Sequence, residues 1–436
     1  MPHRSLLLAC ALLACSAEPD PRRAADGPGE DGSDGSDGSD GSEGSDGTPP
    51  EPVTLAFTDD WNKLAMPEGF RGNSFSGWLA VDLDWDGDGD RDLLLVDEWE
   101  GRLLYLEQAE PRSFLDPVAL DLDPLSDALA AFGDFYDEPF VSQNTSVTHA
   151  QPLTGAPGGA DALVLDLQLN SQLYGSTLFF RPTVVLTPDG TTRLLSLDDT
   201  LRSTVLPDLD GDGSEDVLLG TPTGVAVWWS GTPDGIEAVE LDRAVHLGEP
   251  DRGAAVCTGA GTVLLAQAQP ASAEYELLSL SLTPGSSRLE GRRVDTRPLW
   301  WLASPERRTC AASLIAVPEL DPMIRFRDVD GEAVRSADGE PLAGGRVWMA
   351  QLDGRDGLDL IDAATDAPRI LLDDGAGAFE VRALGLPDTE GRQLTTPAVG
   401  LGGTVSDLDG DGLDDLVSTA NNEEQIWVSI GWNETE

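Results

Sequence analysis

Beyond residue 53 the chain alternates short runs of aliphatic and β-branched residues with turn segments rich in Gly, Pro, Asp and Ser. Residues 93–96 and 224–229 are typical of these apolar runs. Long stretches with the 3.6-residue period of an amphipathic helix are rare. The pattern therefore predicts an all-β fold built from short strands and tight turns.

Three of the turn segments share the pattern Asp-x-Asp-Gly-Asp-Gly-x-x-Asp, which begins at Asp84, Asp208 and Asp407. Carboxylates this dense repel one another, and a hard divalent cation is the usual reason for them to lie together. Calcium takes roughly six to eight oxygen ligands, and Asp at positions 1, 3 and 5 can wrap the ion while Gly at position 6 permits the sharp turn. We therefore expect about three structural Ca²⁺ sites. The predicted ligands are the side chains of Asp84, Asp86, Asp88, Asp92, Asp208, Asp210, Asp212, Asp216, Asp407, Asp409, Asp411 and Asp415, and the position-7 carbonyls of Asp90, Ser214 and Leu413.

Apolar runs flank these loops, which indicates strand–loop–strand units. An EF-hand would instead place helices around the loop and a Glu at position 12. Paired catalytic carboxylates are the alternative interpretation, because glycosidases use two acids about 5–10 Å apart. The regular spacing, with Gly at positions 4 and 6 of all three copies, favours structural metal.

The loops also mark a longer repeat, because each is followed by a strand, a turn and another strand. Their starts, with a degenerate copy near residue 351, fit a unit of roughly 50–65 residues. The degenerate copy, at 347–361, loses the first Asp and shifts the spacing by one, while 161–166 and 262–267 resemble blades without a metal loop. This unit length predicts a β-propeller of about seven four-stranded blades over 53–436, with six or eight as alternatives. A strand at 53–57 is expected to close the ring.

The repeated Asp pattern, with Gly-x-Gly-x-Phe at 375–379, resembles the FG-GAP/VCBS repeat family, whose members form integrin-α-like β-propellers. The resemblance extends from residue 75 to about residue 432 and is carried mainly by the three loops. It implies a propeller with calcium-binding blades. The chain departs from the family pattern in two ways: about half of the expected blades lack a metal loop, and the Phe-Gly…Gly-Ala-Pro signature is incomplete.

The N-terminus has the features of an export signal. Arg4 precedes a short apolar stretch, 5–14, which is too short to cross a bilayer. The stretch ends in Leu-Leu-Ala-Cys15-Ser16, which resembles the bacterial lipobox and implies a signal peptide over 1–14 with lipid on Cys15. A plain secretory signal is the alternative. By family analogy Ser16 favours the outer membrane, so we expect an exported protein, lipid-anchored at the bacterial outer membrane or cell surface and touching the membrane only through that lipid.

Residues 15–52 contain a Gly-Ser-Asp triplet repeated from 32 to 47 and lack large apolar side chains, which predicts a disordered acidic tether. A loose calcium-buffering tract is the alternative. The formal net charge of −52 excludes nucleic-acid binding through phosphates, so nucleic acid is not an expected partner.

Cys257 and Cys310 lie in the expected metal-free blades. An exported chain reaches an oxidising compartment, where a disulfide between them is expected, with two buried free thiols as the alternative. Such a bridge would order the local structure where calcium is absent.

The remaining residues give a broad functional expectation. The pairs Trp228-Trp229 and Trp300-Trp301 place one ring on each face of a strand, so one ring of each pair is a candidate exposed platform for a sugar. His149 and His246 are too few for a zinc site or a catalytic triad. We expect a binding or adhesion module for a protein or glycan ligand and not an enzyme. A polysaccharide lyase or hydrolase, and a structural envelope component, are the alternatives.

Overall fold

The computed structural model describes residues that all belong to one of the chain's two units, Pro52–Glu436. The described residues are 57, 60–64, 78–97, 102–120, 142–155, 159–173, 176–196, 202–232, 235–247, 253–259, 261–268, 274–297, 299–303, 310, 313–318, 321–345, 347–355, 357–362, 369–374, 378–383, 404–421 and 426–435. The predicted signal peptide, the lipidation site Cys15 and the tether lie outside them.

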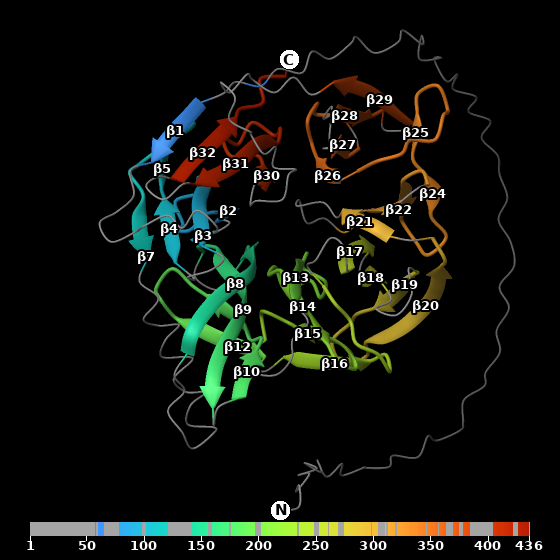
Figure 1. Ribbon diagram of the computed structural model, residues 1–436, viewed down its shortest axis with the longest axis horizontal. Coiled ribbons are helices and arrows are strands. Elements are labelled where there is room, and N and C mark those ends of the chain that lie inside the picture. Colours follow the sequence, from blue (N-terminus) through green and yellow to red (C-terminus); the bar gives the residue numbers. More distant parts are fainter. Residues whose placement is uncertain are drawn as a thin grey trace, which may run out of the picture. The chain divides into compact units, whose positions relative to one another are not determined.

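These residues form seven sheets of four or five strands and one small two-stranded sheet. The first strand of each blade contacts the first strands of the two neighbouring blades, and the contacts run in a closed cycle (Figure 1). The prediction of an all-β propeller with seven four-stranded blades is confirmed. The described residues include no helix that could span a bilayer.

The strands of the first four blades follow one another along the chain, and each blade adds its strands outward from the centre. Blade I has β2 (Trp78–Leu83), β3 (Asp92–Asp97), β4 (Leu103–Leu106) and β7 (Val118–Leu120). Blade II has β8 (Ser142–Leu153), β9 (Ala162–Leu173), β11 (Thr183–Leu186) and β12 (Thr192–Ser196), with β10 (Ser176–Phe180) added beside β9. Blade III has β13 (Ser203–Leu206), β14 (Asp216–Thr221), β15 (Gly224–Trp228) and β16 (Ile236–Glu240). Blade IV has β17 (Gly253–Gly259), β18 (Thr262–Ala268), β19 (Tyr275–Ser281) and β20 (Arg288–Asp295).

The last three blades complete the ring. Blade V has β21 (Leu299–Ala303), β22 (Leu314–Pro318), β23 (Ile324–Phe326) and β24 (Glu332–Ala333). Blade VI has β26 (Val347–Ala350), β27 (Asp359–Asp362), β28 (Arg369–Asp373) and β29 (Ala378–Ala383), with β25 (Arg335–Ser336) parallel to β29. Blade VII has β30 (Thr404–Ser406), β31 (Asp415–Asn421), β32 (Ile426–Gly431) and, as its outer strand, β1 (Asp60–Leu64). Blade I also carries a side hairpin, β5 (Gln108–Glu110) and β6 (Ser113–Phe114).

The ring is closed by an N-terminal strand that pairs with the C-terminal β32, as expected. The strand begins later in the sequence than predicted. The closing strand is β1, whose Asp60 lies opposite Ile430 and whose Leu64 lies opposite Ile426. Of the expected strand 53–57, only Phe57 is described, and it forms an isolated bridge with Asn433. Closure leaves β32 without an open edge.

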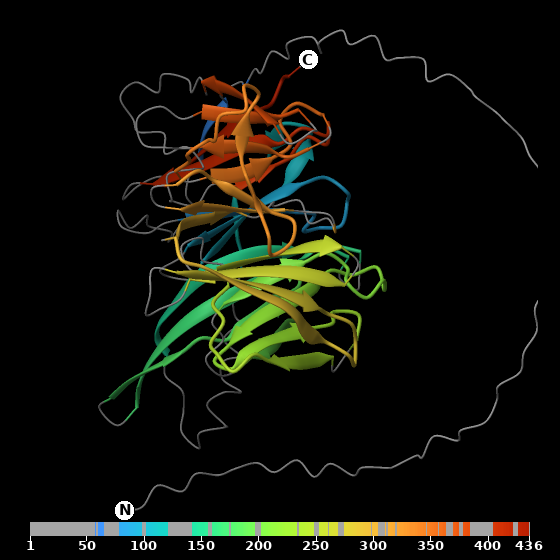
Figure 2. The same cartoon turned by 90° about the vertical axis from the view of Figure 1, so that its right-hand side faces the viewer.

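Hydrophobic cores fill the gaps between neighbouring blades, one core to each of the seven gaps. In β3, Leu93 and Leu95 face blade VII, while Leu94 and Val96 face blade II. Both faces of such a strand are therefore buried, and this is why its sequence is an unbroken apolar run. Figure 2 shows the sheets stacked side by side.

This packing corrects one expectation about the tryptophans. Trp228 and Trp229 do lie on opposite faces of their strand, but each is buried, one in the core between blades II and III and the other between blades III and IV. Neither ring is an exposed sugar platform. The side chains of Trp300 and Trp301 lie outside the described part of the structure.

Candidate metal centres

The three Asp loops occupy equivalent places in the propeller. Residues 84–92, 208–216 and 407–415 join the first and second strands of blades I, III and VII. The corresponding turns of neighbouring blades contact one another, which places these loops together at one face of the ring. For example, the Asp84 amide donates to Asp161 of blade II (3.0 Å), and the Asp414 amide donates to the Gln351 carbonyl of blade VI (2.7 Å).

The backbone of each loop folds around its first three Asp side chains in the same way. In the first loop the Gly89 amide donates to Asp84 (3.1 Å), the Asp88 amide to Asp86 (3.1 Å) and the Asp90 amide to Asp88 (2.9 Å). The other two loops repeat these three bonds at 2.8–3.1 Å and 2.8–3.3 Å. In each loop these bonds join backbone amides to the carboxylates at positions 1, 3 and 5.

Glycine is required at positions 4 and 6 of the loop. In the second loop Gly211 has φ of 85° and Gly213 has φ of 95°, a region that side chains with a Cβ rarely adopt. The first and third loops have the same signs and similar values at both positions. The Gly residues in the sequence pattern therefore report a real backbone constraint.

The Asp at position 9 is buried, and its main role is to fasten the loop to its own blade. Asp216 accepts the amide of Leu209 at position 2 (3.0 Å) and the amide of Ser230 after the third strand (3.2 Å). Asp92 and Asp415 accept the equivalent pairs of amides at 2.8–3.0 Å. The sequence interpretation treated this residue only as a metal ligand and missed this structural role.

Carboxylates from each loop converge closely enough to share one cation. Asp84, Asp86 and Asp92 each offer one ligand atom within 4.8 Å of the others, and Asp208, Asp210 and Asp216 do the same in the second loop. In the third loop the converging set is Asp407, Asp409 and Asp411. The other predicted ligands do not belong to these converging sets: Asp88, Asp90, Asp212, Ser214, Leu413 and Asp415.

The donor chemistry fits a hard divalent cation such as calcium. The converging atoms are all carboxylate oxygens, which Ca²⁺ prefers and which suit softer thiophilic metals less well. Burial raises the pKa of Asp216 and of Asp415 to about 7, because desolvation opposes the charged form. A cation bound beside them would favour the ionised form. A bound ion would also link carboxylates that otherwise repel one another.

A fourth loop, 351–359 in blade VI, keeps the frame of the other three, with Asp at positions 3 and 9 but not at positions 1 and 5. The Leu352 amide donates to Asp359 (2.8 Å) and the Asp373 amide donates to the other oxygen of Asp359 (2.8 Å), as at position 9 elsewhere. This alignment places Gln351 at position 1 and Arg355 at position 5. The predicted one-residue shift in spacing is therefore wrong: the loop has the same length and has lost two Asp residues.

Two side chains of this loop stand at positions where the other three loops carry Asp. The Arg355 guanidinium lies 3.5 Å from the buried Asp353 carboxylate at position 3. Gln351 Nε2 donates to the Arg355 carbonyl (2.8 Å) and to the Gly357 carbonyl at position 7 (3.3 Å). The fourth loop thus supplies its own positive charge and its own donors.

We expect Arg355→Ala to destabilise the fold by about 1–3 kcal/mol, because it leaves the Asp353 carboxylate buried without its cation. Urea denaturation in calcium and in chelator measures the effect, which should be the same in both. Arg382→Ala is the control, because Arg382 pairs with the exposed Glu380 and such pairs contribute little. A loss of stability that appears only in calcium would contradict this role of Arg355.

A positively charged side chain of the neighbouring blade contacts the third loop. Arg112, at the tip of the β5–β6 hairpin of blade I, donates from Nε to Asp409 Oδ2 at 2.7 Å. Its guanidinium also lies 5.4 Å from the Trp432 ring centre. The Arg112 backbone has φ of 66°, which costs free energy for a residue with a Cβ. The side-chain contacts offset that strain.

We expect Arg112→Gln to raise the calcium affinity of the third loop by roughly tenfold, because it removes a positive charge that competes for a ligand carboxylate. Calorimetric titration measures this affinity in an Asp86→Asn/Asp210→Asn background, in which the third loop alone is intact. Arg288→Gln, on the outer strand of blade IV, is the control. An unchanged or weaker affinity in Arg112→Gln would show that the two cations do not compete.

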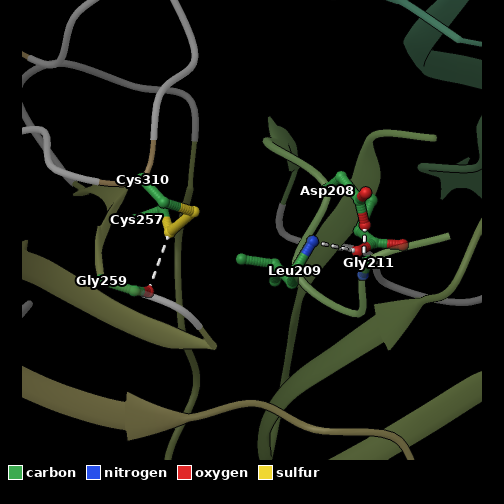
Figure 3. The surroundings of a disulfide bond; sticks show 7 residues. Asp208, Leu209, Gly211, Cys257, Gly259 and Cys310 are labelled. Atoms are coloured by element: carbon green, nitrogen blue, oxygen red, sulfur yellow. Dashed lines mark hydrogen bonds between the residues drawn. A yellow bond between two sulfur atoms is a disulfide. The ribbon is translucent and has the colours of Figure 1, made fainter. Parts of the chain in front are cut away.

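The blades without Asp loops are joined to their neighbours by other means. In the first turn of blade II, Asp161 pairs with Arg91 of the blade I loop (3.0 Å). On the other side of this turn, the Thr154 amide donates to Glu215 of the blade III loop (2.7 Å). Between blades IV and V, Cys257 and Cys310 form a disulfide, which Figure 3 draws near the 208–216 loop. Cys257 lies near the end of β17, the first strand of blade IV, and Cys310 lies in the connection between β21 and β22 of blade V.

Comparisons with known proteins leave the family of the chain open. No protein-family model matches the chain, and no curated protein matches it. Similar solved structures include a rhamnogalacturonan lyase (10% identity, 86% of this chain and 90% of that chain, TM-score 0.33) and an Agrocybe aegerita lectin that recognises non-reducing terminal N-acetylglucosamine (14%, 82% and 79%, 0.35). An oligogalacturonate lyase in complex with manganese is also similar (9%, 87% and 98%, 0.29). These likenesses concern the fold alone.

They correct one prediction from the sequence. The expectation that the chain is not an enzyme is contradicted by this comparison, because two of the similar solved structures are lyases. The class that the fold defines is a seven-bladed β-propeller.

Proposed function

We propose that the chain is a calcium-stabilised β-propeller of the FG-GAP/VCBS type that serves as an extracytoplasmic binding module for a protein or glycan. The observation that carries the proposal is the equivalence of the three Asp loops. They lie at the same position of three blades, fold with the same hydrogen bonds and bring three carboxylates within 4.8 Å in each. Three local copies of one cage suit a scaffold better than a single working site.

Bound calcium would neutralise the clustered carboxylates and fix each turn between the first and second strands. Because the unfolded chain has no preformed cage, the free energy of binding adds to the stability of the folded state. Asp84, Asp86 and Asp92 would hold the ion in the first loop. The ligands would be Asp208, Asp210 and Asp216 in the second loop, and Asp407, Asp409 and Asp411 in the third. Loops without an Asp cluster remain available for a ligand.

A pulldown with glycan and protein panels tests the binding function. The bait is the full chain, presented in calcium and in chelator, and the glycans are sized before and after contact. Calcium-dependent capture of an intact ligand supports the proposal. Shortening of a glycan would assign an enzymatic role to the chain instead, and equal capture in chelator would contradict the role of calcium.

The lipid anchor at Cys15 is part of the same proposal and rests on the lipobox-like sequence alone. Its test is the mass of the N-terminal peptide from a bacterial host, which should carry acyl chains on Cys15. A Cys15→Ser variant should move from the membrane fraction to the soluble fraction. An unmodified Cys15 would favour the plain secretory signal.

A further inference from the structure

The β5–β6 hairpin of blade I contacts two of the three Asp loops at once. Its first residue, Gln108, is buried, and its backbone amide donates to Asp92, position 9 of the first loop, at 2.9 Å. Gln108 Nε2 donates to the carbonyl of Leu408, position 2 of the third loop, also at 2.9 Å. One residue thus joins loops whose contacting residues are far apart in the sequence.

The contact with the third loop lies between two of its ligands. Leu408 separates Asp407 from Asp409, and the Leu408 amide donates to Asp415 of the same loop (3.0 Å). At the hairpin tip, Arg112 contacts Asp409 directly. The hairpin is held in place by Phe114, which packs against the core between blades VII and I. A change in the conformation of either loop therefore alters the contacts that position the hairpin.

The same device occurs a second time in the next gap of the ring. Asn433 follows the third strand of blade VII as Gln108 follows that of blade I. Its amide donates to Asp415 (2.8 Å), and its Nδ2 donates to the carbonyl of Leu352 at position 2 of the fourth loop (2.9 Å). A buried carboxamide that links the end of one loop to the start of the next is thus a repeated feature.

We infer that the β5–β6 hairpin couples cation binding at loops 84–92 and 407–415, so that filling one raises the affinity of the other. The inference rests on the proposed calcium sites. An ion in the first loop orders Asp92, Asp92 fixes Gln108, and Gln108 fixes Leu408 between Asp407 and Asp409. The second ion then binds a loop that is already ordered, which is positive cooperativity.

Calcium calorimetry on the full chain tests the coupling, in an Asp210→Asn background that disables the second loop. The third loop should bind calcium about fivefold or more tightly when the first loop is intact than when it carries Asp86→Asn. In Gln108→Met, which keeps the side-chain length but removes the donor, this difference should vanish. Gln267→Met is the matched control, because Gln267 is an equally buried amide that bonds Glu276 within blade IV.

The outcomes separate this inference from the function on which it rests. Equal affinity of the third loop with and without Asp86→Asn overturns the coupling while leaving the calcium sites intact. A difference that persists in Gln108→Met overturns the role of the hairpin. Absence of calcium binding in the unmodified chain overturns the proposed sites and the coupling with them. Should Gln108→Met fail to fold, Gln108→Asn, whose shorter side chain cannot reach Leu408, gives the same readings.

Discussion

Removal of calcium is expected to lower the melting temperature of the propeller by on the order of 10 °C. Extracellular modules often bind calcium with Kd of about 10⁻⁴ M, so 10 mM calcium would stabilise the folded state by about 2.7 kcal/mol at each site. Three loaded sites give about 8 kcal/mol, and each kcal/mol shifts the melting temperature of a large domain by a few degrees at most. Melting curves in calcium, in chelator and after return of calcium measure the effect.

A comparison of Asp→Asn variants inside and outside the loops shows whether the Asp loops are responsible. The triple variant Asp86→Asn/Asp210→Asn/Asp409→Asn should melt at the same temperature with and without calcium. Asp338→Asn, an exposed carboxylate outside the loops, should keep the full calcium response. Elemental analysis of the dialysed chain should find about three calcium ions. If the chelator leaves the melting temperature unchanged, the three loops are not structural calcium sites.

Loss of the disulfide is expected to have the second-largest effect. The bridge closes a segment with a sequence separation of 53 residues. In the chain-entropy model a loop of this size stabilises the folded state by about 4 kcal/mol. Cys257→Ala/Cys310→Ala should therefore lower the free energy of unfolding by about 2–4 kcal/mol, which urea denaturation measures. The effect should persist in chelator, because the entropy of the unfolded chain does not depend on calcium.

The bridge itself is checked by peptide mapping of the denatured chain without reductant. A cross-linked peptide containing Cys257 and Cys310 is expected, and alkylation should leave both residues unmodified. In the single variant Cys257→Ala, Cys310 should become available to alkylation. Alkylation of both cysteines in the unreduced chain would show that they are free thiols.

The sequence predicted features whose cause lies within a few neighbouring residues. The three Asp loops were found because their ligands and glycines fall within nine residues, and the blade number followed from their spacing. The side chains that connect the loops could not be found in this way. Gln108 and Leu408 are 300 residues apart, and a single buried Gln carries no local signal.

The fourth loop shows a different limit. Gln351 and Arg355 replace Asp residues without changing the length of the turn. An alignment based on carboxylates alone therefore displaces this segment by one residue relative to the other loops. Only the bonds to Asp359 reveal the true alignment. Likewise, the buried positions of Trp228 and Trp229 depend on blades packing against both faces of a sheet, which strand patterns alone do not show.

The strand that closes the ring also determines how the propeller responds to a mechanical load. β1 is the described strand nearest the N-terminus, and it joins the last blade through five residue pairs with β32. If the N-terminus is fixed to a surface and a ligand pulls on the blades, the tension reaches β1 before any other described strand. The seam between β1 and β32 is then the first to yield, and its strength sets the force at which the ring opens.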